Sequence, residues 1–338
     1  MASAASEQIP PAGRVLVIFP GALGDLVCLG PALRALARRH PGAALELMAR
    51  EELARFAVDR IGITRIEVAG GDSPPHARTY SRVYSRAYSI DRREVAALFA
   101  AHADLTEAAE FFRPFTRIYS FFASDDARFR RALEKAATPG AVSFHAFRPA
   151  GAGHVAAGYL GDLGERGAPL DGHIEVLAGD LAEARQALAR LGLGGARVVL
   201  LFPGSGGAHK NWPADNFATL ASALRQPLRA LVVLGPAEAA IEPVLIPRLR
   251  ARGIAWLRDQ PLSTVAGLAR LAAGFAGNDS GVSHLAAAAG APGVVLFGPT
   301  DPERWRPLGR VKIIRALPLS DLAPAAVAAA LKEISQVD

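Results

Sequence analysis

Hydrophobic positions along the chain form short continuous runs, and these alternate with segments in which apolar and charged residues follow helical spacing. The run at 14–19 is rich in β-branched residues, which is typical of a strand buried on both faces. A glycine-rich turn at 20–25 leads to a predicted helix at 31–39, where leucines and arginines take opposite faces. The apolar run at 44–49 predicts the next strand.

The middle of the chain is less regular. Short helices and strands are expected to continue to about residue 162, but Gly71–Ile90 lacks clean periodicity and is predicted to be a loop. A stretch rich in glycine, proline and charge at about 164–178 precedes a second series of elements. The sequence therefore predicts an N-terminal domain at 14–170 and a C-terminal domain at 171–338, and it allows the final helix to pack back on the N-terminal domain.

The second series repeats the alternation of strand and helix. Strands that alternate with helices form parallel sheets joined by right-handed crossovers, so the predicted class is α/β with mostly parallel sheets. The predicted helices cover 181–192, 214–225, 263–274 and 321–335, and the predicted strands cover 197–202, 228–235, 253–257 and 293–298.

The two predicted domains begin alike. RVLVIFPG at 14–21 and RVVLLFPG at 197–204 match nearly residue for residue, and in both a buried strand runs into a Pro-Gly turn. The repeat suggests two Rossmann-like halves, although two buried strands can also resemble each other by coincidence. Halves of this kind bind ligands at the carboxyl ends of their strands.

Composition and charge narrow the class of protein. Of the 338 residues, 51% are hydrophobic, which excludes a disordered or fibrous chain. The one cysteine, Cys28, excludes a disulfide scaffold and fits a reducing compartment. The net charge of +6 comes from dispersed arginines beside only four lysines, which points weakly to phosphate-bearing ligands or an anionic membrane surface. Motifs for nucleic-acid binding, targeting or membrane spanning are absent from the sequence, so a soluble cytoplasmic protein is expected.

The first of three candidate ligand-binding turns follows the first strand and reads Gly21-Ala22-Leu23-Gly24-Asp25. Its glycines let the backbone approach a ligand closely. Asp25 lies where a helix begins, so it is either a helix-terminal charge or a general base aimed into a cleft. The spacing is not GxGxxG, which disfavours a dehydrogenase.

The second turn is PGSGGAHKNWP at 203–213. Its small residues, among them Ser205 and Gly206, can surround a phosphate with N–H groups and a hydroxyl, and Lys210 adds a positive charge. A plain surface turn is the alternative. His209 is expected to be a loop residue rather than a metal ligand.

The third turn is GNDSGVSH at 277–284. Asp279 or Ser280 can cap the helix that begins here, which is a sufficient structural role. The same helix N-terminus also offers N–H groups to a diphosphate, with Gly281 leaving room and His284 lying one turn into the helix.

Metal and hydrolase motifs are missing from the sequence. It contains no histidine pair, Cys-x-x-Cys or Asp-x-Asp pattern for a metal, and no Gly-x-Ser-x-Gly elbow follows a strand. Asp125 and Asp126 are expected to cap the helix that follows them. Neither a metal nor a cofactor is therefore predicted.

In this order, the three turns resemble those of glycosyltransferase family 9, the ADP-heptose:lipopolysaccharide heptosyltransferases. The resemblance rests on GALGD with Pro31 shortly after it, on PGSGGAHKNWP, and on GNDSGVSHLAAAAGAPGVVLFGPTDPERW. It covers roughly 14–50 and 197–310. It implies a GT-B fold, in which two Rossmann-like domains face each other across a cleft that binds a nucleotide-sugar. It also implies an inverting transfer that needs no metal.

Carried over to this sequence, the resemblance implies a role for each turn. Asp25 would be the general base for the acceptor hydroxyl, beside the acceptor-side glycines Gly21 and Gly24. Lys210 would bind the diphosphate and stabilise the leaving nucleotide. Glu238 matches the position of an acidic contact to the nucleotide ribose. The other donor-binding positions are Asp279 at the sugar, Ser280, Gly281 and His284 at the diphosphate, and Ser205 and Gly206 in the second turn.

Two residues depart from the family pattern. Phe19 follows the first strand where a basic residue is usual, and Phe202 precedes the second Pro-Gly where a histidine is usual. Both losses bring the acceptor and the sugar into question. The segment Arg78–Arg93 could bind an acidic acceptor, although a solvated loop is the simpler interpretation.

The function that the resemblance implies is the transfer of heptose from ADP-heptose to a lipopolysaccharide core or a related, lipid-linked glycan. It places this reaction in the cytoplasm and allows a peripheral contact with the inner face of the inner membrane. Three alternatives stay open: a nucleotide-sugar epimerase of the same fold, a protein-modifying glycosyltransferase, and a non-catalytic nucleotide-sugar binder.

Overall fold

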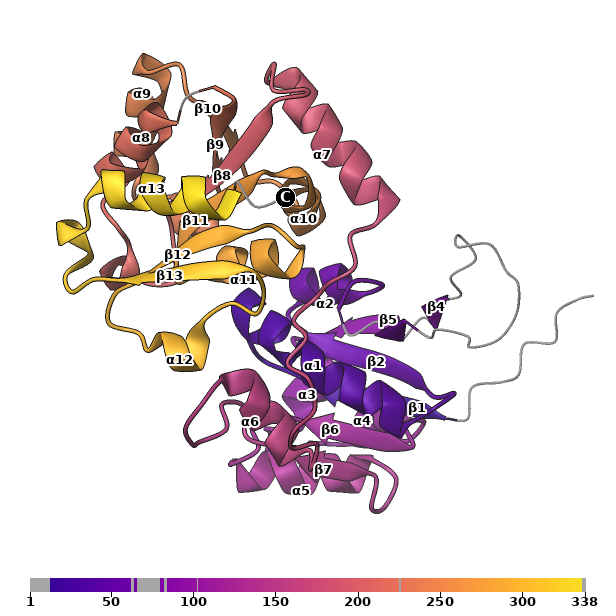
Figure 1. Ribbon diagram of the computed structural model, residues 1–338. Coiled ribbons are helices and arrows are strands. Elements are labelled where there is room, and N and C mark those ends of the chain that lie inside the picture. The colour runs from indigo at the N-terminus through magenta and orange to yellow at the C-terminus, as the bar shows by residue number, and fades with distance from the viewer. Residues whose placement is uncertain are drawn as a thin grey trace, which may run out of the picture. The chain divides into compact units, whose positions relative to one another are not determined.

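The computed structural model divides the chain into two compact units (Figure 1). The first comprises residues up to Pro20 and Leu33–Pro149, and the second comprises Gly21–Ala32 and the chain from Ala150 onward. The sequence-based boundary at 170–171 lies further along the chain than this division. The structure describes residues 13–61, 64–65, 80–81, 84–101, 103–224 and 226–335.

The first unit is built on a parallel five-stranded sheet in the order β5-β2-β1-β6-β7. One of its core clusters lies between the sheet and the helices α3, α4 and α5. A separate antiparallel pair joins β3 (Thr64–Arg65) to β4 (Tyr80–Ser81). The other elements are β1 (Arg14–Ile18), β2 (Ala44–Ala49), α2 (Glu51–Ala57), β5 (Tyr84–Ser89), α3 (Arg93–Ala97), α4 (Thr106–Phe112), β6 (Arg117–Ser120), α5 (Ala127–Ala136) and β7 (Val142–Phe144).

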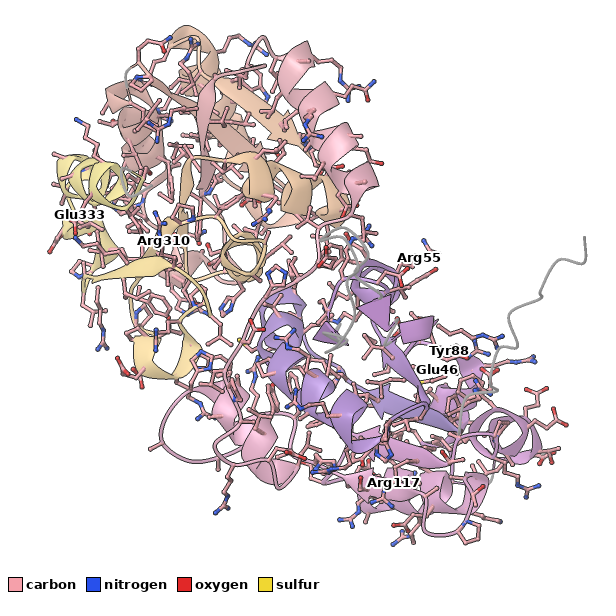
Figure 2. All side chains as sticks on the ribbon, turned by 45° about the vertical axis from the view of Figure 1, so that its right-hand side comes forward. Glu46, Arg55, Tyr88, Arg117, Arg310 and Glu333 are labelled. Carbon is pink, nitrogen blue, oxygen red and sulfur yellow. The ribbon has the colours of Figure 1, made fainter. Side chains whose placement is uncertain are left out.

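The predicted loop at Gly71–Ile90 is wrong at its C-terminal end, because β5 pairs with β2 at the sheet edge. Because β5 (YSRAYS) contains many polar residues, it has no apolar run that would predict a strand. Tyr88 nevertheless anchors it, since its hydroxyl donates to Glu46 Oε2 at 2.6 Å. Arg14 binds both carboxylate oxygens of Glu46, at 2.8 and 2.9 Å. One nearly buried carboxylate thus joins three strands, and Figure 2 labels Glu46 beside Tyr88. Arg78 lies outside the described residues.

The second unit is built on a parallel six-stranded sheet in the order β10-β9-β8-β11-β12-β13. Helices α8, α9 and α13 lie on one face and α7, α10 and α11 on the other (Figure 1). The strands are β8 (Arg197–Phe202), β9 (Leu228–Leu234), β10 (Ala255–Arg258), β11 (Gly274–Asn278), β12 (Gly293–Phe297) and β13 (Val311–Arg315). The helices are α6 (Val155–Asp162), α7 (Ala178–Arg190), α8 (Ala214–Ala223), α9 (Glu242–Ala251), α10 (Leu262–Leu271), α11 (Gly281–Ala288), α12 (Pro302–Trp305) and α13 (Pro324–Ser335).

Two strands of this sheet, β11 and β13, are not predicted from the sequence. β11 (GFAGN) contains two glycines and directly follows an alanine-rich helix, so its hydrophobic run is short. β13 (VKIIR) is an edge strand with charged residues. Both are strands because each continues a parallel ladder, β11 with β8 and β13 with β12, which no local pattern reveals.

The helix α1 (Leu23–Arg39) begins earlier than predicted and belongs to both units. Its first turn includes Gly24 and Asp25, which were expected to lie in a turn before the helix. The Asp25 carboxylate supports this start by accepting the Ala22 N–H at 3.2 Å. The division between the units falls within α1, directly after Pro31 and Ala32.

The two sheets share one topology. In each, the strand that comes first in the chain lies between the second and the fourth strand of its sheet: β1 lies between β2 and β6, and β8 lies between β9 and β11. The repeated segments at 14–21 and 197–204 therefore start equivalent strands, β1 and β8. The predicted α/β class with two Rossmann-like, parallel-sheet domains is confirmed. Across the described residues, no helix combines the length and apolarity that a bilayer-spanning segment requires.

Candidate active site

The crossovers of the second sheet make a topological switch point between β8 and β11, where a ligand-binding crevice is expected. These neighbours pair in parallel, with Gly277 opposite Phe202, but the connections that leave them run to opposite faces of the sheet. Loops at such a switch point diverge and leave room for a ligand at the carboxyl ends of the strands. The second and third predicted turns are the loops that follow β8 and β11, so the topology brings them together.

A pair of opposite charges marks this crevice. Lys210 Nζ lies 3.1 Å from Asp279 Oδ2, although 69 residues separate the two in sequence. The Thr300 hydroxyl, after β12, donates to the same oxygen at 2.7 Å. The Asp279 side chain is 8% exposed and that of Lys210 is 27% exposed, so the carboxylate is buried and the ammonium group still reaches solvent. Thr300 was missed in the sequence, where only its place after an apolar run could have indicated it.

The contacts of Asp279 and Ser280 decide whether either side chain caps the helix α11. Asp279 does not cap α11, because its side chain turns to Lys210 and Thr300 instead. Ser280 occupies the N-cap position, but in the described part of the chain its side chain makes no capping hydrogen bond and lies 3.2 Å from the Ser283 hydroxyl. The Ser283 and His284 N–H groups donate to the Ser280 carbonyl at 3.1 and 3.3 Å. Among the described residues, the N–H groups of Gly281 and Val282 are thus left for a ligand or water.

Asn278 fixes the two loops relative to each other. Its side chain is completely buried, accepts the Trp212 N–H at 2.9 Å and donates to the Pro203 carbonyl at 2.7 Å. The Ser283 hydroxyl donates to the Asn278 carbonyl at 2.7 Å. A buried amide that is hydrogen-bonded through both its oxygen and its nitrogen makes a loop rigid. The loop at 203–213 that carries Lys210, called the lysine loop below, and the N-terminus of α11 are therefore held in a defined geometry.

The glycine-rich loop after β8 is held by its own serine. Ser205 Oγ lies 2.6 Å from Asn211 Oδ1 and accepts the Gly207 N–H at 3.3 Å. Gly206 faces open space, since an added Cβ would meet nothing within 4 Å. Ser205 thus shapes the loop that presents Lys210, and Gly206 leaves room beside it.

Glu238 lies in the loop after β9, also at the carboxyl ends of the strands. Its carboxylate accepts the Gly235 N–H at 2.8 Å and is also hydrogen-bonded by the backbone of Gly204. Only 4% of Glu238 is exposed, and burial raises the pKa of its carboxyl group. Glu238, for which the sequence offered only its position after a strand, therefore contacts the lysine loop directly.

Asp25 is buried, with 8% of its surface exposed, in the first turn of α1. Gly21 is also buried. Gly21, Gly24 and Asp25 belong to the same unit as Lys210 and Asp279, even though Phe19 and Pro20 do not. The first predicted turn is therefore part of the same compact body as the second and third.

His284 is a buried, neutral imidazole. Burial lowers its pKa to about 4, with His154 and Lys210 acting in the same direction, while Asp279 and the Trp305 backbone oppose them. The imidazole Nδ1 lies 3.5 Å from Cys28 Sγ.

Acidification should destabilise the protein through His284. The unfolded imidazole titrates near its ordinary pKa of 6.5, so below this pH the unfolded state binds the proton and the folded state does not. The contribution of His284 to stability is complete above pH 6.5 and is lost as the pH falls toward 4. In urea unfolding, we expect the stability advantage of the wild type over His284→Gln to shrink by roughly 2 kcal/mol between pH 7 and pH 5. An advantage that is independent of pH would contradict a buried, neutral imidazole.

The two departures from the family pattern are packing residues. Phe202 is completely buried and its ring lies 5.9 Å from that of Phe275. Phe19 is also completely buried, with its ring 5.9 Å from Phe121 and 5.6 Å from Phe147. Neither position supplies a polar group, and both apolar side chains extend the core toward the carboxyl ends of the strands.

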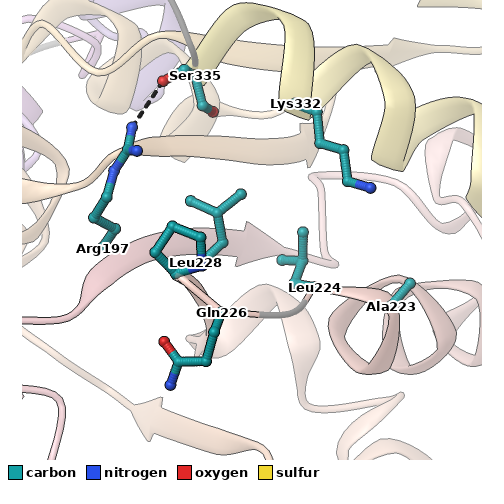
Figure 3. A pocket seen from close by; sticks show the side chains of 8 residues that line it. Arg197, Ala223, Leu224, Gln226, Leu228, Lys332 and Ser335 are labelled. Atoms are coloured by element: carbon teal, nitrogen blue, oxygen red, sulfur yellow. Dashed lines mark hydrogen bonds between the residues drawn. The ribbon is translucent and has the colours of Figure 1, made fainter.

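A cavity of about 280 Å³ in the second unit lies away from these loops (Figure 3). It opens beside the start of β8 and β9, at the amino ends of the strands, and α13 forms another wall. Arg197 and Lys332 line it, but their neighbours are mainly apolar. Lys210, Glu238 and Asp279 lie in the loops after β8, β9 and β11, at the carboxyl ends of the strands. This cavity is therefore not the candidate active site.

The helix α5 begins at a capping aspartate. Asp126 caps α5 as predicted, accepting the N–H groups of Arg128 at 2.8 Å and Phe129 at 3.0 Å. Within the described residues, no three His, Cys, Asp or Glu side chains gather into a group able to ligate a metal.

Comparison with known proteins agrees with this fold. The family model of glycosyltransferase family 9 (heptosyltransferase) matches residues 163–326. Lipopolysaccharide heptosyltransferase 1 of Escherichia coli strain K12 is 27% identical over 162 residues, which are 47% of this chain and 50% of that protein. The chain thus spans about half the length of the curated relatives it matches.

Two solved structures are similar over nearly the whole chain. The glycosyl transferase family 9 protein of Veillonella parvula has a TM-score of 0.73 at 18% identity, covering 97% of this chain and 98% of its own. The E. coli ADP-heptose lps heptosyltransferase II has a TM-score of 0.70 at 19% identity, covering 95% and 98%. At these identities the likeness concerns the fold. The chain is thus similar to glycosyltransferase family 9 in the match of residues 163–326 to the family model and in its three ordered turns.

Proposed function

We propose that this protein is an inverting, metal-independent glycosyltransferase that transfers heptose from ADP-heptose to a lipopolysaccharide core or a related, lipid-linked glycan. The observation that carries the proposal is the Lys210–Asp279 pair at the N-terminus of α11, 3.1 Å between Nζ and Oδ2. The match to the family model and the relatives named heptosyltransferases support the choice of sugar. We place the reaction in the cytoplasm, with peripheral contact at the inner membrane where a lipid-linked acceptor would lie.

The charges of the site support binding of a nucleotide-sugar donor. A diphosphate brings negative charge to the crevice, where the Lys210 ammonium and the N–H groups of Gly281 and its neighbours would receive it. Asp279 orients the lysine before the donor arrives and would then accept a hydroxyl of the sugar. Glu238, held by two backbone N–H groups, is placed to accept the ribose hydroxyls.

The chemical step needs a base and a stabilised leaving group. The Asp25 carboxylate would take the proton of the acceptor hydroxyl while that oxygen forms a bond to the anomeric carbon. The bond between the anomeric carbon and the phosphate oxygen breaks, and the nucleoside diphosphate leaves with the electron pair. Lys210 and the α11 terminus would stabilise this developing charge, which is the largest electrostatic contribution the site can make.

The proposal is tested first by calorimetry with ADP-, GDP- and UDP-sugars. We expect ADP-heptose to bind tightest, since the base and the sugar together define the donor. Incubation of donor alone and donor with a lipopolysaccharide acceptor then separates the reactions. Product that appears only with acceptor supports transfer, whereas a changed sugar in its absence would identify an epimerase.

Replacing Lys210 should weaken donor binding. We expect Lys210→Met to raise the Kd of ADP-heptose by roughly 10- to 100-fold, because a charge-assisted hydrogen bond to phosphate is lost. Lys312→Met is the matched control, because this lysine pairs with Glu333 at an edge strand of the same unit. Equal donor affinity in the two variants would remove Lys210 from the diphosphate site.

A further inference from the structure

The first turn of α1 lies against the first turn of α11 at two glycines. A Cβ atom on Gly24 would lie 3.2 Å from His284 Cδ2 and 3.3 Å from Gly281 Cα. A Cβ on Gly281 would lie 3.0 Å from the Gly24 nitrogen. Real side chains rarely tolerate such distances, so this backbone contact depends on both residues being glycine. Both turns belong to the second unit.

Cys28 adds a directional contact at this junction. Its Sγ lies 3.5 Å from His284 Nδ1, and both side chains are buried. Cys28 follows Asp25 by three residues in α1, so the two side chains lie on the same face of the helix. The contact therefore joins the helical turn that carries Asp25 to α11, whose N-terminus follows Asp279.

The protonation states give this hydrogen bond a direction. Burial raises the pKa of the Cys28 thiol, and the negative charges of Asp25 and Asp279 act in the same sense. Burial keeps the His284 imidazole neutral, so only one ring nitrogen carries a proton, and the Trp305 backbone accepts a hydrogen bond from the ring. A protonated thiol facing an imidazole nitrogen acts as the donor, and the nitrogen facing it accepts.

We propose that Cys28 is a positioning residue that donates its thiol proton to His284 Nδ1 and so holds the Asp25 turn against the donor-binding helix. His284 then carries its own proton on Nε2, toward the Trp305 backbone. Cys28 contacts no reacting atom, but it lies one helical turn after the proposed base in α1 and contacts α11, which follows the proposed donor-binding carboxylate. Its loss would misplace Asp25 relative to the sugar. This role rests on the proposed function.

The direct test is the tautomer of His284 in the wild-type protein. Nitrogen-15 NMR of the eight labelled histidines, with His284→Gln to assign the signal, distinguishes a bare Nδ1 from a protonated one. We expect Nδ1 to be unprotonated and Nε2 to be protonated at pH 7. A His284 with its proton on Nδ1 would overturn the proposal, whatever the activity of the protein.

Two variants of Cys28 separate hydrogen bonding from packing. Cys28→Ser retains a donor of similar size, and Cys28→Val retains the volume without a donor. We expect Ser to keep the wild-type tautomer and its kcat within about threefold, since its hydroxyl replaces the thiol. In Val, kcat should fall by roughly tenfold or more while the KM for the donor changes little, because misplacing a base impairs chemistry more than binding.

The result is decided by the comparison of the two variants. Wild-type kcat and tautomer in the Val variant, or a Ser variant as impaired as Val, would show that the residue only fills space. Thermal unfolding identifies a variant that fails to fold, and the wild-type tautomer then decides alone. A wild type that transfers no sugar to any acceptor would refute the proposed function but not the thiol–imidazole hydrogen bond, so the two failures are distinguishable.

Discussion

Asp25→Asn should abolish sugar transfer while leaving donor binding nearly intact. The amide is isosteric with the carboxylate and can still accept the Ala22 N–H, so the first turn of α1 should keep its geometry. It cannot take a proton from the acceptor hydroxyl. The expected fall in kcat is on the order of 10²- to 10⁴-fold, the usual contribution of a general base, with donor affinity measured by calorimetry in parallel.

The alternative role for Asp25 is a helix-terminal charge that favours the dipole of α1. Asp126→Asn is the control for this role, because Asp126 caps α5 in the first unit and has no part in the proposed reaction. Both variants should lose some stability, but only Asp25→Asn should lose turnover. A variant that retains most of its kcat would exclude Asp25 as the base.

Gly204→Ala should lower donor affinity by displacing Glu238. An added Cβ would overlap the Glu238 carboxyl group, lying 2.5 Å from its Cδ and 3.0 Å from its Cγ. The carboxylate can move only by giving up its hydrogen bonds to the Gly235 and Gly204 backbone. Each such bond to a charged group is worth about 1.5–3 kcal/mol, so we expect a fall in donor affinity of roughly tenfold or more and a measurable loss in urea stability.

Gly206→Ala is the matched control in the same loop, because a Cβ there meets nothing within 4 Å. Its unfolding free energy should stay within about 0.5 kcal/mol of the wild type. A double-mutant cycle then tests the cause. In a Glu238→Ala background the Gly204→Ala change should cost little, since the overlapping group is gone. Equal costs in both backgrounds would show that the effect of Gly204→Ala does not pass through Glu238.

Much of the fold could be predicted because it is encoded locally. The strand at 197–202 was placed to the residue, since a continuous run of β-branched and aliphatic side chains indicates a buried parallel strand. Asp126 was recognised as a cap because its side chain bonds backbone only two and three residues away. The strands at Gly274–Asn278 and Tyr84–Ser89 were missed, because neighbouring strands rather than their own residues make them strands.

The sequence by itself determined the α/β class, the repeated strand starts and the residue types of the three turns, because hydrophobic spacing and turn chemistry act over a few residues. Only the tertiary structure decided which of those residues meet. Lys210 reaches Asp279 across 69 residues, and Cys28 reaches His284 across 256. These contacts depend on strand order and on the crossover to opposite faces of the sheet, which place the carboxyl ends of β8 and β11 side by side. Burial there also sets the protonation of His284 and Cys28, since desolvation exists only once the chain has folded.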